Sequence, residues 1–69
     1  MPIIQITLVE GRDTARVERC IREVARVASE TLDAPLASIR VMVTEVPANR
    51  FAVGTTLKSD PPTPAGGTA

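Results

Sequence analysis

The fold of this chain is decided by two apolar stretches, PIIQITLV at residues 2–9 and IRVMVTEV at residues 39–46. Both stretches are rich in β-branched side chains, which favour strands. A longer amphipathic stretch, from Asp13 to about Leu32, lies between them. Because a helical crossover of this length brings the chain back in the same direction, the sequence predicts a strand, a helix and a second strand parallel to the first.

The stretch between the strands has the period of a helix with one buried face. Apolar residues recur there at steps of three and four, with two more beside them: Val17, Ile21, Val24, Ala28 and Leu32, then Cys20 and Val27. The opposite side carries charges at the i, i+4 spacing of helical ion pairs, Glu18 with Arg22 and Arg19 with Glu23. Asp13 is the expected N-cap, and Pro35 is expected to end the helix because a proline disfavours the helical conformation before it.

Two further segments follow the second strand. Residues 50–57, RFAVGTTL, are expected to form a short extended segment or hairpin after a turn at 47–49. Residues 60–69, DPPTPAGGTA, are rich in Pro and Gly, and we expect a flexible tail there. The sequence therefore predicts one α+β domain at residues 1–59, in which a β-α-β unit with a parallel two-stranded sheet precedes a short C-terminal hairpin.

The chain is too short to bury a large core on its own. It has 69 residues, and a domain of this size commonly needs disulfides, a metal or oligomerisation. Cys20 is the only cysteine and there is no histidine, so neither an internal disulfide nor a metal site is expected. A two-stranded sheet under one helix also leaves a face and both edges open. We therefore expect the sheets of different subunits to pack on one another.

Charge and hydropathy exclude several classes of function. Eight Lys and Arg residues balance eight Asp and Glu residues, and Phe51 is the only aromatic residue. The basic surface with stacking aromatics that binds nucleic acid is therefore not expected. No apolar run approaches the about 20 residues of a membrane span, and the first residues do not resemble a signal peptide. We expect a cytoplasmic protein with no nucleic-acid or membrane partner.

The most unusual chemical feature is Pro2 directly after Met1. Methionine before a small residue is normally removed during maturation, and we expect its removal here. The new terminus would be a secondary amine, which no other position in a chain offers. An apolar pocket lowers the pKa of such an amine by disfavouring its charged form, which suits a general base at neutral pH. Ile3, Ile4 and Ile6 supply apolar neighbours for this pocket.

Two arginines stand apart from those of the predicted helix. Arg12 follows Gly11 at the junction between strand and helix, and Arg40 lies in an otherwise apolar strand, which is also typical of an edge or interface residue. Arginine binds a carboxylate through two parallel hydrogen bonds. A base with two such groups suits a dicarboxylic acid. Cys20, on the apolar stripe of the helix, is expected to be a buried structural thiol.

Taken together, these features resemble the 4-oxalocrotonate tautomerase family. The resemblance rests on an ordered set of segments: Pro2 after the initiator, Glu10-Gly11-Arg12, LDAPL at residues 32–36, SIRVMVTE at residues 38–45, and Phe51. It extends from Pro2 to about Leu57. The family pattern implies the tautomerase fold, a β-α-β subunit that pairs into a dimer with a four-stranded sheet. The implied assembly is a homo-hexamer, a trimer of dimers, with a hetero-hexamer as the alternative.

The resemblance also implies an activity and a site. The reaction is isomerisation of 2-hydroxymuconate to 2-oxo-3-hexenedioate in aromatic hydrocarbon catabolism, with no cofactor. Pro2 would move the proton from the 2-hydroxyl to carbon 5, and Arg12 would bind the distal carboxylate. Arg40 of a neighbouring subunit would bind the 2-oxygen and the adjacent carboxylate. Phe51 would form part of the apolar wall that keeps the pKa of the amine low.

Two alternatives stay open. One is a dehalogenase or hydratase of 3-haloacrylates, which needs a carboxylate to activate water, whereas residues 52–57, AVGTTL, contain no acid. The other is a non-catalytic subunit of a hetero-oligomer, because the family has members built from two similar chains.

The chain also departs from the family pattern in two places. Ala52 stands where many members have glycine, and the C-terminal tail is neutral where many members have basic residues.

Overall fold

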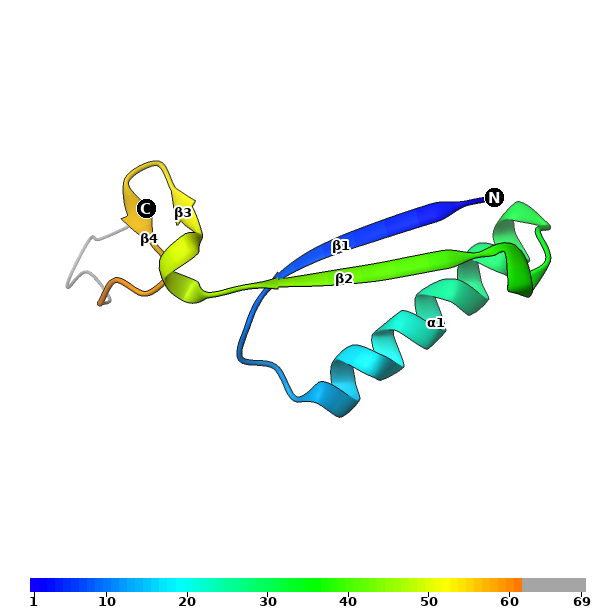
Figure 1. The fold of residues 1–69 in the computed structure, drawn as a ribbon, viewed down its shortest axis with the longest axis horizontal. Coiled ribbons are helices and arrows are strands. Elements are labelled where there is room, and N and C mark those ends of the chain that lie inside the picture. Colours follow the sequence, from blue (N-terminus) through cyan, green and yellow to red (C-terminus); the bar gives the residue numbers. More distant parts are fainter. Residues whose placement is uncertain (62–69) are drawn as a thin grey trace.

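The computed structural model describes residues 1–61, so the tail predicted at residues 60–69 lies outside the described residues except for its first two positions. Figure 1 shows two long strands beside one helix, with a small hairpin beyond the end of the second strand. The elements in chain order are β1 (Ile3–Val9), α1 (Thr14–Leu32), η1 (Leu36–Ser38), β2 (Arg40–Val46), η2 (Ala48–Arg50), β3 (Ala52–Val53) and β4 (Thr56–Leu57). The two η elements are short 3-10 helices.

β1 and β2 form a parallel sheet along their whole lengths. Ile3 pairs with Arg40 at one end of the sheet, and Val9 pairs with Val46 at the other. The chain passes from β1 to β2 through α1, which packs against β2 (Figure 1). These observations confirm the predicted β-α-β unit and its parallel pairing.

The side chains between helix and sheet are half-buried. Those of the two strands alternate with exposed neighbours and comprise Ile4, Ile6 and Leu8 of β1 with Val41 and Val43 of β2. Those of α1 include Val17, Ile21, Val24 and Ala28. Ile39, at 9% exposure, is the only buried residue within residues 1–61. Since full burial of an aliphatic side chain is worth about 1.5–3 kcal/mol and partial burial proportionately less, the core of the single chain is weak.

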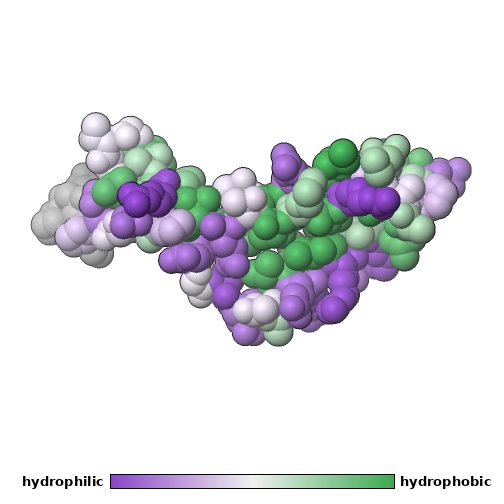
Figure 2. Space-filling view, in the orientation of Figure 1, coloured by the Kyte–Doolittle hydropathy of each residue, from purple (hydrophilic) through white to green (hydrophobic). Residues whose placement is uncertain are grey.

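Among the described residues 1–61, none covers the opposite face of the sheet over most of its length. Ile3 is 59% exposed and Met42 is 46% exposed on this face. Gln5, Thr7 and Thr44 are exposed there as well. Figure 2 shows apolar side chains gathered over the strands, with hydrophilic side chains along the helix. This open face is the surface that the sequence assigns to packing between subunits.

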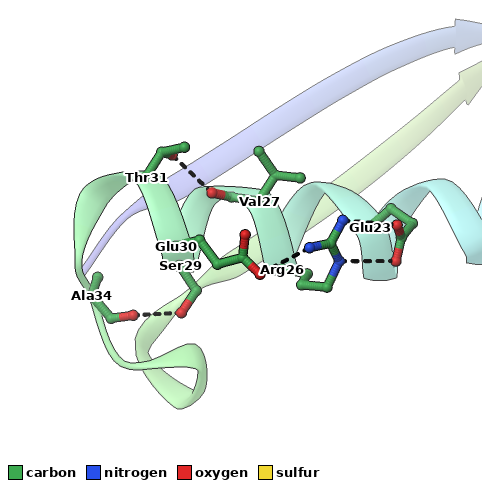
Figure 3. A network of polar contacts seen from close by, with 7 residues as sticks. All are labelled: Glu23, Arg26, Val27, Ser29, Glu30, Thr31 and Ala34. Atoms are coloured by element: carbon green, nitrogen blue, oxygen red, sulfur yellow. Dashed lines mark hydrogen bonds and ion pairs between the residues drawn. The ribbon is translucent and has the colours of Figure 1, made fainter.

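The exposed side of α1 carries a different set of ion pairs from the predicted one. Arg26 donates from Nη1 to Glu30 Oε1 at 2.8 Å and from Nη2 to Glu23 Oε1 at 3.2 Å (Figure 3). The hydrogen bonds and the positive charge of Arg26 hold the pKa of Glu23 below its ordinary value. Neither predicted ion pair forms within residues 1–61, and Arg26 takes the carboxylate that the sequence assigns to Arg19.

The two ends of α1 lie where the sequence places them. Asp13 precedes the helix with extended backbone, although its side chain makes no capping hydrogen bond. Asp33 ends the helix in the left-handed conformation, with φ 53° and ψ 45°, and its N–H donates to the carbonyl of Ser29. Ser29 Oγ in turn donates to the carbonyl of Ala34 at 2.6 Å (Figure 3). Pro35 follows and prevents the helix from continuing.

β3 and β4 form the predicted hairpin. They pair antiparallel, with Ala52 opposite Leu57. Gly54 lies in the turn with φ +61°, a conformation that glycine adopts without strain. Ala52 does not have a positive φ. The hairpin therefore forms with alanine at this position, and glycine is not required there.

Asp33→Val is expected to destabilise the protein by about 1–2 kcal/mol, because a β-branched side chain is strained in the left-handed conformation. Asp33→Asn is the matched control, and we expect it to change the free energy of unfolding by less than about 0.5 kcal/mol. Urea unfolding followed by circular dichroism, at one fixed protein concentration, measures both. A valine variant as stable as the wild type would contradict this interpretation of the helix end.

Candidate functional site

Pro2 and Arg40 lie together at one end of the sheet. The carbonyl of Pro2 accepts the backbone N–H of Arg40 at 3.0 Å, next to the pairing of Ile3 with Arg40. Pro2 is half-buried, whereas Met1 before it is 77% exposed. Removal of Met1 would therefore disturb little packing and would leave the nitrogen of Pro2 as a terminus beside the start of β2.

The guanidinium group of Arg40 is held by backbone carbonyls. Its Nη1 donates to the carbonyl of Ala37 at 2.8 Å and more weakly to that of Ile39 at 3.4 Å. Arg40 is exposed and forms no ion pair with any carboxylate between residues 1 and 61. Its Nε and Nη2 groups make no hydrogen bond within this part of the chain. They are available to an anion.

Arg12 and Phe51 lie in one groove at the other end of the sheet. The groove has a volume of about 380 Å³ and is lined by Thr7, Leu8, Val9, Glu10, Arg12, Phe51 and Lys58. Gly11, with φ +123°, turns the chain from β1 toward α1 and so sets the direction in which Arg12 leaves the strand. Arg12 Nη1 donates to the carbonyl of Val9 at 3.1 Å. Like Arg40, Arg12 forms no ion pair within the described residues.

The hairpin brings Phe51 and Lys58 to the groove together. The carbonyl of Phe51 accepts the N–H of Lys58 at 2.8 Å, so the two residues face each other across the base of the hairpin. The N–H of Leu57 donates to Asp60 Oδ2 at 2.8 Å and closes the segment that follows. The sequence prediction missed Lys58 and Glu10 as lining residues. The register of the predicted hairpin is the signal that could have placed Lys58 opposite Phe51.

The four predicted site residues therefore form two separate pairs. β1 and β2 have seven residues each. At a rise of about 3.3 Å per residue, the two ends of the sheet are about 20 Å apart. Figure 1 shows the N-terminus near one end of the strands and the hairpin beyond the other. One chain cannot bring Pro2 and Arg12 to the same small molecule, so a site that contains all four residues needs more than one subunit.

Three nucleophilic side chains within residues 1–61, those of Ser29, Ser38 and Cys20, lie outside these two pairs. The hydroxyls of Ser29 and Ser38 both donate to nearby backbone carbonyls and so stabilise the turns around them. Cys20 is exposed, so the prediction of a buried thiol is wrong for the single chain. A shallow hollow of about 550 Å³ beside Cys20 is lined by one face of α1 alone and contains none of the predicted site residues.

Residues 1–61 contain neither a cluster of metal-ligating side chains nor a membrane-spanning helix. No group of three or more His, Cys, Asp or Glu side chains in this part of the chain could hold a metal ion. None of its helices combines the length and the hydropathy of a membrane span.

Comparison with known proteins relates this chain to enzymes. A 2-hydroxymuconate tautomerase of Stutzerimonas stutzeri is 50% identical over 54 residues, which are 78% of this chain and 86% of that protein. A 2-hydroxymuconate tautomerase of Pseudomonas putida is 48% identical over 59 residues, which are 86% of this chain and 94% of that protein.

Solved structures share the fold as well. A 4-oxalocrotonate tautomerase homologue superimposes with a TM-score of 0.82 at 33% identity, over 88% of this chain and 97% of its own. A heterohexamer 4-oxalocrotonate tautomerase from Chloroflexus aurantiacus J-10-fl gives a TM-score of 0.82 at 32% identity, over 87% of this chain and 97% of its own. The model of the Tautomerase enzyme family matches residues 2–60. This chain is therefore a member of the tautomerase enzyme family.

Proposed function

We propose that this chain catalyses the 1,5-keto-enol tautomerisation of a dienol diacid, with 2-hydroxymuconate converted to 2-oxo-3-hexenedioate. The observation that carries the proposal is the likeness to the two relatives named 2-hydroxymuconate tautomerase, which spans nearly the whole length of each. Arg12 and Arg40 support it further, because neither forms an ion pair within residues 1–61 and each offers guanidinium N–H groups to a carboxylate of the substrate.

The proposed base is the amine of Pro2, freed by removal of Met1. Its nitrogen takes the proton from the 2-hydroxyl, and the electrons of that O–H bond form the 2-oxo group. The two carbon–carbon double bonds then become one, between carbons 3 and 4, while the same nitrogen returns the proton to carbon 5. A group that both accepts and donates a proton works best when its pKa lies near the ambient pH. The half-burial of Pro2 supports this role.

Arg12 is proposed to bind the carboxylate distal to the reacting hydroxyl. Negative charge moves toward this carboxylate as the dienolate forms, so a positive group held there stabilises the transition state more than the substrate. The hydrogen bond from Arg12 Nη1 to the carbonyl of Val9 restricts the side chain before substrate arrives. Phe51 in the same groove excludes water, which strengthens the interaction between the charges.

Arg40 is proposed to act on the 2-oxygen and the adjacent carboxylate from a subunit that neighbours the one supplying Arg12, because Arg40 lies beside Pro2 of its own chain. The separation of about 20 Å between the two ends of the sheet supports a shared site, because no single chain holds both arginines near one substrate. The open outer face supports assembly through packing of sheets. We propose a homo-hexamer built as a trimer of dimers, with a hetero-hexamer as the alternative.

Pro2→Ala is expected to lower kcat with 2-hydroxymuconate by about 10²–10⁴-fold, the range that general acid–base catalysis supplies. Alanine at this position still permits removal of Met1, so the variant differs in the terminal amine alone. Intact mass spectrometry should show that both proteins begin at residue 2, and sedimentation should show the same assembly. Turnover close to that of the wild type, or an active protein that keeps Met1, would rule out Pro2 as the base.

Arg12→Ala is expected to reduce kcat/KM for 2-hydroxymuconate by about 10–100-fold, since a hydrogen bond to a charged group is worth about 1.5–3 kcal/mol. Turnover of the enol of phenylpyruvate, a monoacid, should change little because it has no distal carboxylate. Arg22→Ala removes the same charge from the exposed side of α1 and should affect neither substrate. An equal loss for both substrates in Arg12→Ala would mean that this residue does not bind the distal carboxylate.

Sedimentation of the wild type at micromolar concentration is expected to show an assembly. Met42→Lys places a charge on the open face of the sheet, and burying an unpaired charge there should dissociate the assembly with loss of folded structure. Glu18→Lys, on the exposed side of α1, is the control and should leave the assembly intact. A stable, folded monomer of the wild type would contradict the proposal that the sheets of different subunits must pack on one another.

A further inference from the structure

Lys58 is the only lysine in the chain, and it lines the groove of Arg12 and Phe51. The hydrogen bond from its N–H to the carbonyl of Phe51 at 2.8 Å fixes its backbone at the base of the hairpin. Its side chain forms no ion pair within residues 1–61. The ammonium group is therefore a positive charge beside the groove that no carboxylate of the described chain neutralises.

The net charge of the groove depends on Lys58. Three charged residues line it: Arg12 and Lys58 are positive, and Glu10 is negative. Without Lys58, the negative charge of Glu10 would balance that of Arg12 and the lining would be neutral. Charges in one small groove act on a ligand together, because salt at physiological strength screens only over about 8 Å. With Lys58, the groove attracts anions.

We propose that Lys58 binds the distal carboxylate of the substrate together with Arg12 and thereby makes the enzyme selective for doubly charged dienol acids. The two residues serve different purposes. The planar guanidinium of Arg12 fixes the orientation of the carboxylate, whereas an ammonium is a compact charge on a flexible stem that follows the ligand. The inference rests on the proposed function for the identity of the substrate, but binding of a dicarboxylate in the groove can be measured without turnover.

Kinetics with a diacid and a monoacid test the selectivity. Lys58→Met, which keeps an unbranched side chain one atom shorter and removes its charge, is expected to lower kcat/KM for 2-hydroxymuconate about fivefold, mainly through KM. The effect should shrink as salt is added. The monoacid enol of phenylpyruvate should be turned over as by the wild type, and Lys58→Arg should restore the diacid rate. Arg22→Met, the same charge change outside the groove, should alter neither rate.

A diacid rate that Lys58→Met leaves unchanged would overturn the inference. So would equal losses for diacid and monoacid, or a loss of the same size in Arg22→Met, because each would separate the effect from the distal carboxylate.

Binding without catalysis provides a second measurement. Protein labelled with ¹³C at the lysine ε-carbon gives a single lysine side-chain signal, because Lys58 is the only lysine. This signal should shift on titration with trans,trans-muconate, an unreactive dicarboxylate without a hydroxyl. Sorbate, which has a methyl group in place of the distal carboxylate, should shift it much less.

A lysine signal that muconate does not move would overturn the inference, whether or not the enzyme is active. If wild-type protein did not turn over 2-hydroxymuconate, the proposed function would fail, and the muconate titration would still decide the role of Lys58.

Discussion

A single helix laid over a two-stranded sheet covers one face and leaves the other in water. This constraint explains why Ile39 alone is buried within residues 1–61 while Ile3 and Met42 remain open on the outer face. Burial of apolar surface stabilises a protein by about 25 cal/mol for each Å² removed from water. The open face of the sheet can contribute this stabilisation only when another subunit covers it. The proposed assembly would therefore contribute both to stability and to the completion of each site.

The two arginines that are proposed to bind the substrate, Arg12 and Arg40, are held in the same way. Arg12 donates to the carbonyl of Val9 and Arg40 to that of Ala37, in each case three residues earlier in the chain. Nη1 of each guanidinium is thereby held by the backbone, while Nε and Nη2 make no hydrogen bond within residues 1–61. Less side-chain entropy is then lost when a carboxylate binds, which is the advantage of preorganised groups in binding and catalysis.

The fold could be predicted from the sequence because its signals are local and agree with one another. Alternating β-branched residues mark the strands, and Pro35 marks the end of the helix. The incorrect predictions concern features that depend on tertiary and side-chain contacts. Cys20 is exposed because a sheet of two strands is narrower than the apolar stripe of α1. Arg26 competes for the carboxylate assigned to another arginine. The place of Arg40 beside Pro2 depends on the register of the strands, and the place of Lys58 depends on that of the hairpin. Composition and periodicity do not specify either register.

The hydrogen bond between the carbonyl of Pro2 and the N–H of Arg40 has a consequence for the newly exposed end of the chain. Chain termini usually fray, and a frayed amine would sample many positions. Here the residue that would carry the amine is already tethered to β2 by its own carbonyl. The backbone hydrogen bonds between β1 and β2 would therefore fix the position of the Pro2 nitrogen before Met1 is cleaved off. Maturation would change this nitrogen from an amide to an amine and leave its position in the molecule unaltered.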